Sequence, residues 1–133
     1  MKILKAQNYL PNPDNLPHLK IQQVEVDKLF ILTDHNWMMK RYPLFEKHMS
    51  AKGMQWPIVY TSEEHHWNPP KEKRWPRDLF GYIPGLGVHT GNKRVYWAKR
   101  NGYTHIEGYF VKSKDEKDSI VSKTMMRDKD YTL

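Results

Sequence analysis

The stretch that most constrains the fold is a basic segment enclosed by two glycines, Gly91 and Gly102. Thr90 precedes the first glycine, and its hydroxyl can accept a bond from a free backbone N–H as an N-cap. Gly102 suits the C′ position, because glycine readily adopts the left-handed conformation that ends many helices. The segment therefore predicts a helix of about ten residues that begins at Gly91. Residues 103–111, which are rich in β-branched and aromatic side chains, predict a strand after it.

The first turn of this helix combines features that attract anions. Lys93 and Arg94 are positively charged, the free N–H groups and the helix dipole add positive potential, and Gly91 lets the backbone approach a ligand. We therefore predict that Thr90, Gly91, Asn92, Lys93 and Arg94 bind a phosphate, for example that of a nucleotide. A glycine before a basic helix is also common without any ligand. The pattern matches neither a dinucleotide fingerprint nor a Walker loop.

The composition favours an anionic partner. The chain has 133 residues, enough for one domain with a modest core, and a formal net charge of +7. Aromatic residues make up 13% of the chain, and some of them, such as Tyr96 and Trp97, lie beside Lys or Arg. This mixture suits base stacking with phosphate contacts nearby, although each such ring can equally fill the core. Nucleic acid is therefore the first partner to consider, with a nucleotide as the next.

Several classes of protein are excluded or disfavoured. The chain contains no cysteine, which excludes disulfides, thiolate catalysis and cysteine-based zinc sites. It has no apolar run of about 18 residues and no signal-peptide pattern at its N-terminus. We therefore expect a cytoplasmic protein that does not span a membrane.

Hydrophobic spacing and turn residues predict the other elements along one domain covering residues 1–133. Residues 1–17, with several prolines and asparagines, are expected to form a flexible N-terminal arm, and residues 113–133 a charged C-terminal segment with a short helix from Ser113 or Lys114. The intervening elements are an α+β mixture. We expect strands at 19–26, 56–61 and 86–89, helices at 35–42 and 44–52, and a long irregular loop at 62–87.

Three motifs resemble the ParB/sulfiredoxin-like superfamily, also called ParB-like nuclease domains. Residues 24–29 read Val-Glu-Val-Asp-Lys-Leu and resemble the first strand of such domains. Gly53, followed by Pro-Ile-Val at 57–59, is similar to the family's second motif, a glycine followed by Pro-Ile-x-Val. Residues 91–94 are similar to the Gly-x-x-Arg box of the family. From the first motif to the strand predicted after the box, the resemblance covers roughly two thirds of the chain.

The resemblance implies a small mixed sheet with two or three helices and a phosphate site at the box. Small stand-alone members are frequent in phages and plasmids, which implies a phage-type protein in the host cytoplasm. Two differences limit what is carried over. Asn92 and Lys93 stand where ParB has an acidic residue and an arginine, which puts ParB-type nucleotide hydrolysis in doubt. The lack of cysteine excludes sulfiredoxin chemistry. Too few residues follow Val111 for the DNA-reading helix-turn-helix of ParB.

Two further groups of residues are candidates for function. Glu25 and Asp27, at the end of the first predicted strand, could act as a base or hold a metal ion, although acids at the end of a strand are more often plain surface residues. His89, beside the box, could donate to a bound phosphate or transfer a proton, and could equally be a half-buried strand residue. The loop at 62–87 carries basic residues and an aromatic that could clamp a nucleic-acid backbone or could simply be solvated. These residues are Lys71, Lys73, Arg74, Trp75 and Arg77.

Three functions follow from these residues. The first is a ParB-like nucleic-acid-binding protein with a nucleotide or phosphate at residues 91–94. The second is an enzyme on the same fold, a nuclease, an NTPase or a small-molecule kinase, which would bind a nucleoside triphosphate with Mg²⁺. The third is a phage accessory protein that binds a host protein.

Overall fold

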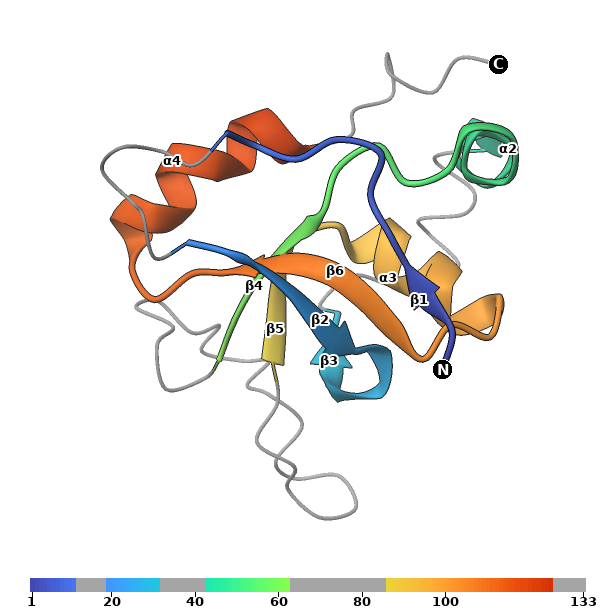
Figure 1. Cartoon of the computed structure of the whole chain (residues 1–133), viewed down its shortest axis with the longest axis horizontal. Coiled ribbons are helices and arrows are strands. Elements are labelled where there is room, and N and C mark those ends of the chain that lie inside the picture. The colour runs from blue at the N-terminus through green and yellow to red at the C-terminus, as the bar shows by residue number, and fades with distance from the viewer. Residues whose placement is uncertain (12–18, 32–42, 63–85, 126–133) are drawn as a thin grey trace.

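The fold is a mixed β-sheet with helices on both of its faces (Figure 1). The structure, a computed structural model, describes residues 1–11, 19–31, 43–62 and 86–125. Within these residues the α+β class predicted from the sequence is confirmed. The expected helix at 35–42, most of the expected loop at 62–87 and the last eight residues lie outside the described part.

Six strands form the sheet within the described residues. Their order is β1-β6-β4-β5-β3, and β2 also pairs with β6. β6 is parallel to β1 and β4 and antiparallel to β2, while β5 is antiparallel to β4 and parallel to β3. The strands are β1 Ile3–Leu4, β2 Ile21–Glu25, β3 Leu29–Phe30, β4 Ile58–Ser62, β5 Leu86–Thr90 and β6 His105–Phe110.

The sheet must curl, because a single short turn joins the strands at its two opposite edges. β2 pairs with β6, and β3 pairs with β5 at the far end of the strand order. Only the 3₁₀ turn η1, Val26–Lys28, separates these two strands in the chain. Figure 1 shows β2 and β3 close together, with β6 running beside β2. The curled sheet leaves room on its inner side for a helix.

Three α-helices are described, and local signals set several of their ends. α2 is Pro43–Lys52, followed by Gly53 at φ 76°. α4 is Lys114–Thr124, and the Ser113 side chain caps it by accepting a bond from the Glu116 N–H at 3.2 Å. α3, Asn92–Arg100, ends at Gly102, also at φ 76°, with the Tyr103 N–H bonded to the Ala98 carbonyl at 3.0 Å. This bond is the 6→1 contact of a Schellman motif, so the predicted role of Gly102 is confirmed.

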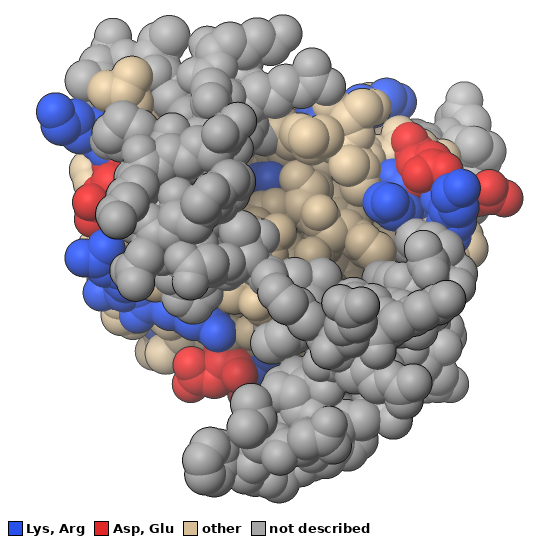
Figure 2. Space-filling view, turned by 180° about the vertical axis from the view of Figure 1, so that it is seen from behind, with Lys and Arg blue, Asp and Glu red and all other residues tan. Residues whose placement is uncertain are grey.

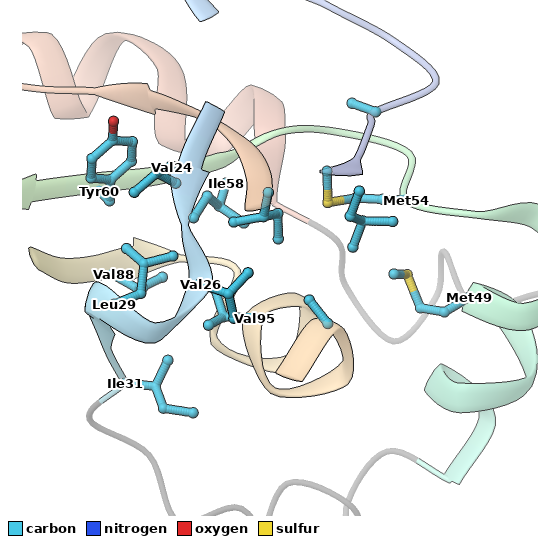
Figure 3. Packing of buried hydrophobic residues seen from close by; sticks show 14 of the residues in the cluster. Val24, Val26, Leu29, Ile31, Met49, Met54, Ile58, Tyr60, Val88 and Val95 are labelled. Carbon is cyan, nitrogen blue, oxygen red and sulfur yellow. The ribbon is translucent and has the colours of Figure 1, made fainter. Parts of the chain in front are cut away.

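The two faces of the sheet carry separate apolar clusters. On one face, Ile58 and Ile106 pack with Val95 of α3, and residues of α2 join the same cluster (Figure 3). On the other face, Val59 and Tyr109 pack with Ile120 of α4. Since neighbouring strand residues point to opposite sides, α3 and α4 cover opposite faces of the sheet.

The N-terminal segment differs from the flexible arm that the sequence led us to expect. Ile3 and Leu4 pair with β6, and the Gln7 and Asn8 N–H groups bond to the carbonyls of Met54 and Gln55 at 2.8 and 3.0 Å. The prolines that suggested an irregular arm all lie at position 11 or later. The residues before them are free to pair with β6 and with the segment after α2, and these bonds hold them against the sheet.

Candidate nucleic-acid interface

The box at residues 91–94 sits where β5 ends and α3 begins. Gly91 is the N-cap of α3 and has a left-handed backbone conformation, with φ 111°. The predicted N-cap role of Thr90 is therefore wrong. Gly91 has no side chain, so no side-chain cap closes this helix end, and the first turn contains no acidic residue. The end of the helix keeps its positive character, as an anion site requires.

Gly91 is required by packing. A Cβ atom at Gly91 would lie 2.5 Å from Cγ2 of Ile58, closer than any real contact. A Cβ atom at Gly108 would lie 2.7 Å from Cγ1 of the same side chain. The two glycines thus make room for Ile58, which is fully buried between β6 and the start of α3. This accounts for Gly91 without the close approach of a ligand that its sequence context suggested.

Arg94 points into the protein. Its side chain is only 2% exposed, and Nη1 donates to the carbonyls of Trp56 and Pro57 at 2.6 and 2.9 Å. Nη2 lies 3.4 Å from the Thr90 hydroxyl. Carbonyls just before a strand have no partner in the ladder, and a planar guanidinium can bind several acceptors at once. The predicted phosphate ligand Arg94 thus joins the start of β4 to α3.

The opposite side of α3 carries a different set of residues, which we call the outer face: Lys93, Tyr96, Trp97 and Arg100. Their spacing of three, one and three residues places them along one side of a helix, opposite the buried Arg94, Val95 and Ala98. Lys93, Tyr96 and Trp97 are half-buried and Arg100 is exposed. No residue of α3 is acidic. The outer face is therefore both basic and aromatic.

The cations of this region lie over aromatic rings. The Arg100 guanidinium is 5.6 Å from the Tyr96 ring centre, and Lys93 Nζ is 5.4 Å from that of Phe45 in α2. Beyond the helix, the Trp97 and Tyr103 rings are 5.7 Å apart, and Lys2 Nζ lies 4.3 Å from the Tyr103 ring centre. The three distances from a cation to a ring centre are within the range of cation–π contacts. Rings and cations thus lie close together from α3 to the N-terminus.

The surface around this part of the molecule is visible in Figure 2, which views the protein from behind. The face is hollowed at its centre, and the described atoms in the hollow are not acidic. Basic side chains gather along the left flank of that view, with a few acidic ones among them.

The predicted acidic candidates do not lie at the box. Asp27 is in η1 close to Lys99, near the C-terminal end of α3, and Lys99 Nζ donates to the Leu29 carbonyl at 3.0 Å. Burial lowers the pKa of Lys99, and the charge of Asp27 partly opposes this. Glu25 is exposed and pairs with Lys28 at 3.5 Å. The box is at the other end of α3, roughly 10 Å away at 1.5 Å per residue.

The remaining predicted residues fall into two groups. His89 is half-buried in β5, next to Thr90, and so lies at the same end of α3 as the box. The basic loop residues Lys71, Lys73, Arg74, Trp75 and Arg77 lie outside the described residues. In the described part, no three His, Asp or Glu side chains are grouped so that they could hold a metal ion.

One polar cluster was not anticipated from the sequence. Glu107 of β6 is buried, and its Oε1 accepts bonds from the Ala6 N–H, at 2.8 Å, and from the Tyr9 hydroxyl. The Tyr109 hydroxyl accepts a bond from the Leu10 N–H at 3.0 Å. These bonds fasten the N-terminal segment to the sheet. An acid inside an otherwise apolar strand was the available signal, since a buried carboxylate needs partners.

Comparison with known proteins adds no assignment. No protein-family model, curated protein or solved structure matches the chain. None of the described helices has the length and apolar character needed to cross a membrane.

Proposed function

We propose that this protein binds nucleic acid and that the outer face of α3 is its contact surface. The observation that carries the proposal is the combination of Lys93 and Arg100 with Tyr96 and Trp97 on one side of a helix without acids. Cations neutralise phosphates, and aromatic rings offer flat apolar surface to bases or sugars. The net charge of +7 acts in the same direction over the whole molecule.

In this proposal a phosphate group binds at the start of α3. The uncapped N-terminal N–H groups and Lys93 are its donors, and Arg94 supports the site from inside. The phosphate belongs to the nucleic-acid backbone or to a nucleotide, with Mg²⁺ accompanying a triphosphate. A catalytic role is the weaker alternative, because Glu25 and Asp27 lie away from the box.

We also propose that the fold is of the ParB/sulfiredoxin-like type. The order of elements supports this: Val-Glu-Val-Asp-Lys-Leu forms the end of β2, η1 and the start of β3. Gly53 ends α2, Ile58 begins β4, and the box begins α3, which is followed by β6. The second and third motifs thus occupy the kind of element that the resemblance implies, whereas half of the first motif forms η1 and not a strand.

The test is a binding titration with fluorescently labelled DNA and RNA between about 50 and 200 mM salt. We expect affinity to fall steeply with salt. In the double variant Lys93→Gln/Arg100→Gln, losing two phosphate contacts should reduce the slope of log K against log salt by about 1.4 to 1.8. Weak binding with no dependence on salt would contradict the proposal and favour a host protein as the partner.

A matched control separates a specific contact from net charge. Lys114 and Lys123 are exposed on α4, which covers the opposite face of the sheet from α3. The double variant Lys114→Gln/Lys123→Gln removes the same charge from a place that the proposal does not use. An equal loss of affinity in both double variants would show that only the overall charge matters.

A further inference from the structure

The aromatic residues around α3 point to a particular form of nucleic acid. Resting on the proposed function, we infer that the protein prefers single-stranded nucleic acid, whose unpaired bases stack on Tyr96, Trp97 and Tyr103. Duplex binding through phosphates needs cations alone. The described surface instead interleaves its cations with half-buried rings, at Arg100 over Tyr96 and at Lys2 over Tyr103.

The position of the rings supports this preference. Tyr96 and Trp97 follow each other on α3, and the Trp97 ring is tilted by 32° against that of Tyr103 beyond the helix end. Each of the three residues is half-buried: it packs against the core while part of it remains accessible, and Nε1 of Trp97 is on the buried side. In a duplex, base faces are covered by their neighbours. In a single strand they are open to stacking, and every base offers such a face.

The charges complement the rings along the same path. Lys93 and Arg100 flank Tyr96 and Trp97 on the helix, and Lys2 lies beside Tyr103. Lys2 is held there, because its Nζ also donates to the Asn101 carbonyl at 3.0 Å. A strand lying along this path would place phosphates near cations and bases near rings, as in other single-strand grooves.

The experiment compares oligothymidylate, oligouridylate and a DNA duplex as labelled probes for the full chain. We expect both single strands to bind at least about 5-fold more tightly than the duplex, because a stacked base contributes at least that much. Since the rings do not read the sugar, the DNA and RNA strands should bind alike. Tighter binding of the duplex would overturn the inference and leave the proposed function standing. Absence of binding to all three probes would overturn both.

Substitutions at Tyr96 make the test specific to stacking. Tyr96→Leu removes the aromatic ring but keeps apolar volume, and Tyr96→Phe keeps the ring and removes the hydroxyl. We expect Tyr96→Leu to weaken single-strand binding about 5-fold or more, with an unchanged salt slope, because stacking releases no counterions. Tyr96→Phe, which keeps the ring, should retain more of the affinity than Tyr96→Leu.

Melting curves of both variants check that the fold is kept. If Tyr96→Leu is too unstable to assay, the same comparison can be made at the Tyr103 ring, with Tyr103→Leu as the test variant and Tyr103→Phe as its control. Equal affinity of a folded Leu variant and its Phe control would overturn the inference.

Discussion

The two sides of α3 use neighbouring basic residues for opposite purposes. Arg94 is 2% exposed and donates to two backbone carbonyls, so its charge serves the fold. Lys93, one residue earlier, and Arg100, near the helix end, lie on the outer face over aromatic rings. In the sequence Lys93 and Arg94 look like a single basic motif, and the helix turns them to opposite sides. Adjacent charges therefore need not belong to the same site.

The acidic residues repeat this contrast. Glu107 is buried and accepts bonds from the N-terminal segment, whereas Glu25 is exposed and pairs with Lys28. Glu25 was predicted as a catalytic candidate because it lies at the end of a strand. The buried one does more for the structure. Whether a charged residue supports the fold or a ligand depends on its burial.

The largest effect is expected on the inner side of α3. Arg94→Ala removes three donors and leaves the Trp56 and Pro57 carbonyls without them inside the protein. We expect the free energy of unfolding to fall by about 3–5 kcal/mol, from the unsatisfied carbonyls and the cavity. Urea denaturation followed by circular dichroism measures this. Arg94→Lys should recover only part, because an ammonium lacks the planar fork. Loss of ligand binding by a fully stable Arg94→Ala would instead place Arg94 in a ligand site.

A smaller effect is expected at the glycine that begins α3. Gly91→Ala combines a left-handed backbone with a Cβ atom 2.5 Å from Ile58, so we expect a loss of about 2–4 kcal/mol. Gly102→Ala is the control, since it has φ 76° but no atom within 4 Å of the added Cβ. It should cost about 1–2 kcal/mol, from the backbone alone. Equal losses in the two variants would show that the contact with Ile58 does not decide the need for glycine.

The buried acid gives a prediction in pH. The hydrogen bond to Glu107 is the main reason that the pKa of Tyr9 rises from 10.0 to about 12, with burial and the charge of Glu107 adding to it. The folded state therefore favours the protonated phenol. This contribution to stability is complete below pH 10 and is lost as the pH rises towards 12.

Tyr9→Phe isolates this contribution. We expect it to lower stability at neutral pH by about 1 kcal/mol, because Tyr9 is half-exposed and its bond is partly replaced by water. The difference between Tyr9→Phe and the natural protein should shrink above pH 10. Tyr60, whose pKa burial also raises to about 12, acts equally in both proteins. A difference that stayed constant up to pH 12 would show that the bond to Glu107 does not control this titration.

The smallest effect on stability is expected on the outer face. Lys93→Gln/Arg100→Gln should change the free energy of unfolding by no more than about 0.5 kcal/mol per site, as at other surface positions. Nucleic-acid affinity should fall in the same variant. Thermal melting and the binding titration together measure both. A stability loss as large as that of Arg94→Ala would show that the two sides of α3 do not differ in the way proposed.

The helix and strand boundaries around α3 were predictable because local chemistry sets them. Gly102 ends the helix in a left-handed conformation, Ser113 caps α4, and β-branched and aromatic residues mark β6. The prediction of Thr90 as the N-cap was wrong for a reason outside the local sequence. Ile58, 33 residues earlier in the chain, occupies the space beside position 91. No side chain fits there, and the glycine at this position is the N-cap.

By itself the sequence determined the α+β class, the ends of α2 and α3 at the glycines that follow them, the start of α4, and the basic, aromatic character of α3. These depend on spacing, capping and composition, which act over a few residues. Only the tertiary structure decided that Arg94 faces inward while Lys93 faces outward, that Glu107 holds the N-terminal segment, and that Asp27 lies at the far end of α3 from the box. Such choices depend on which distant segments pack against each residue, and burial becomes defined only when the sheet has curled around the helix.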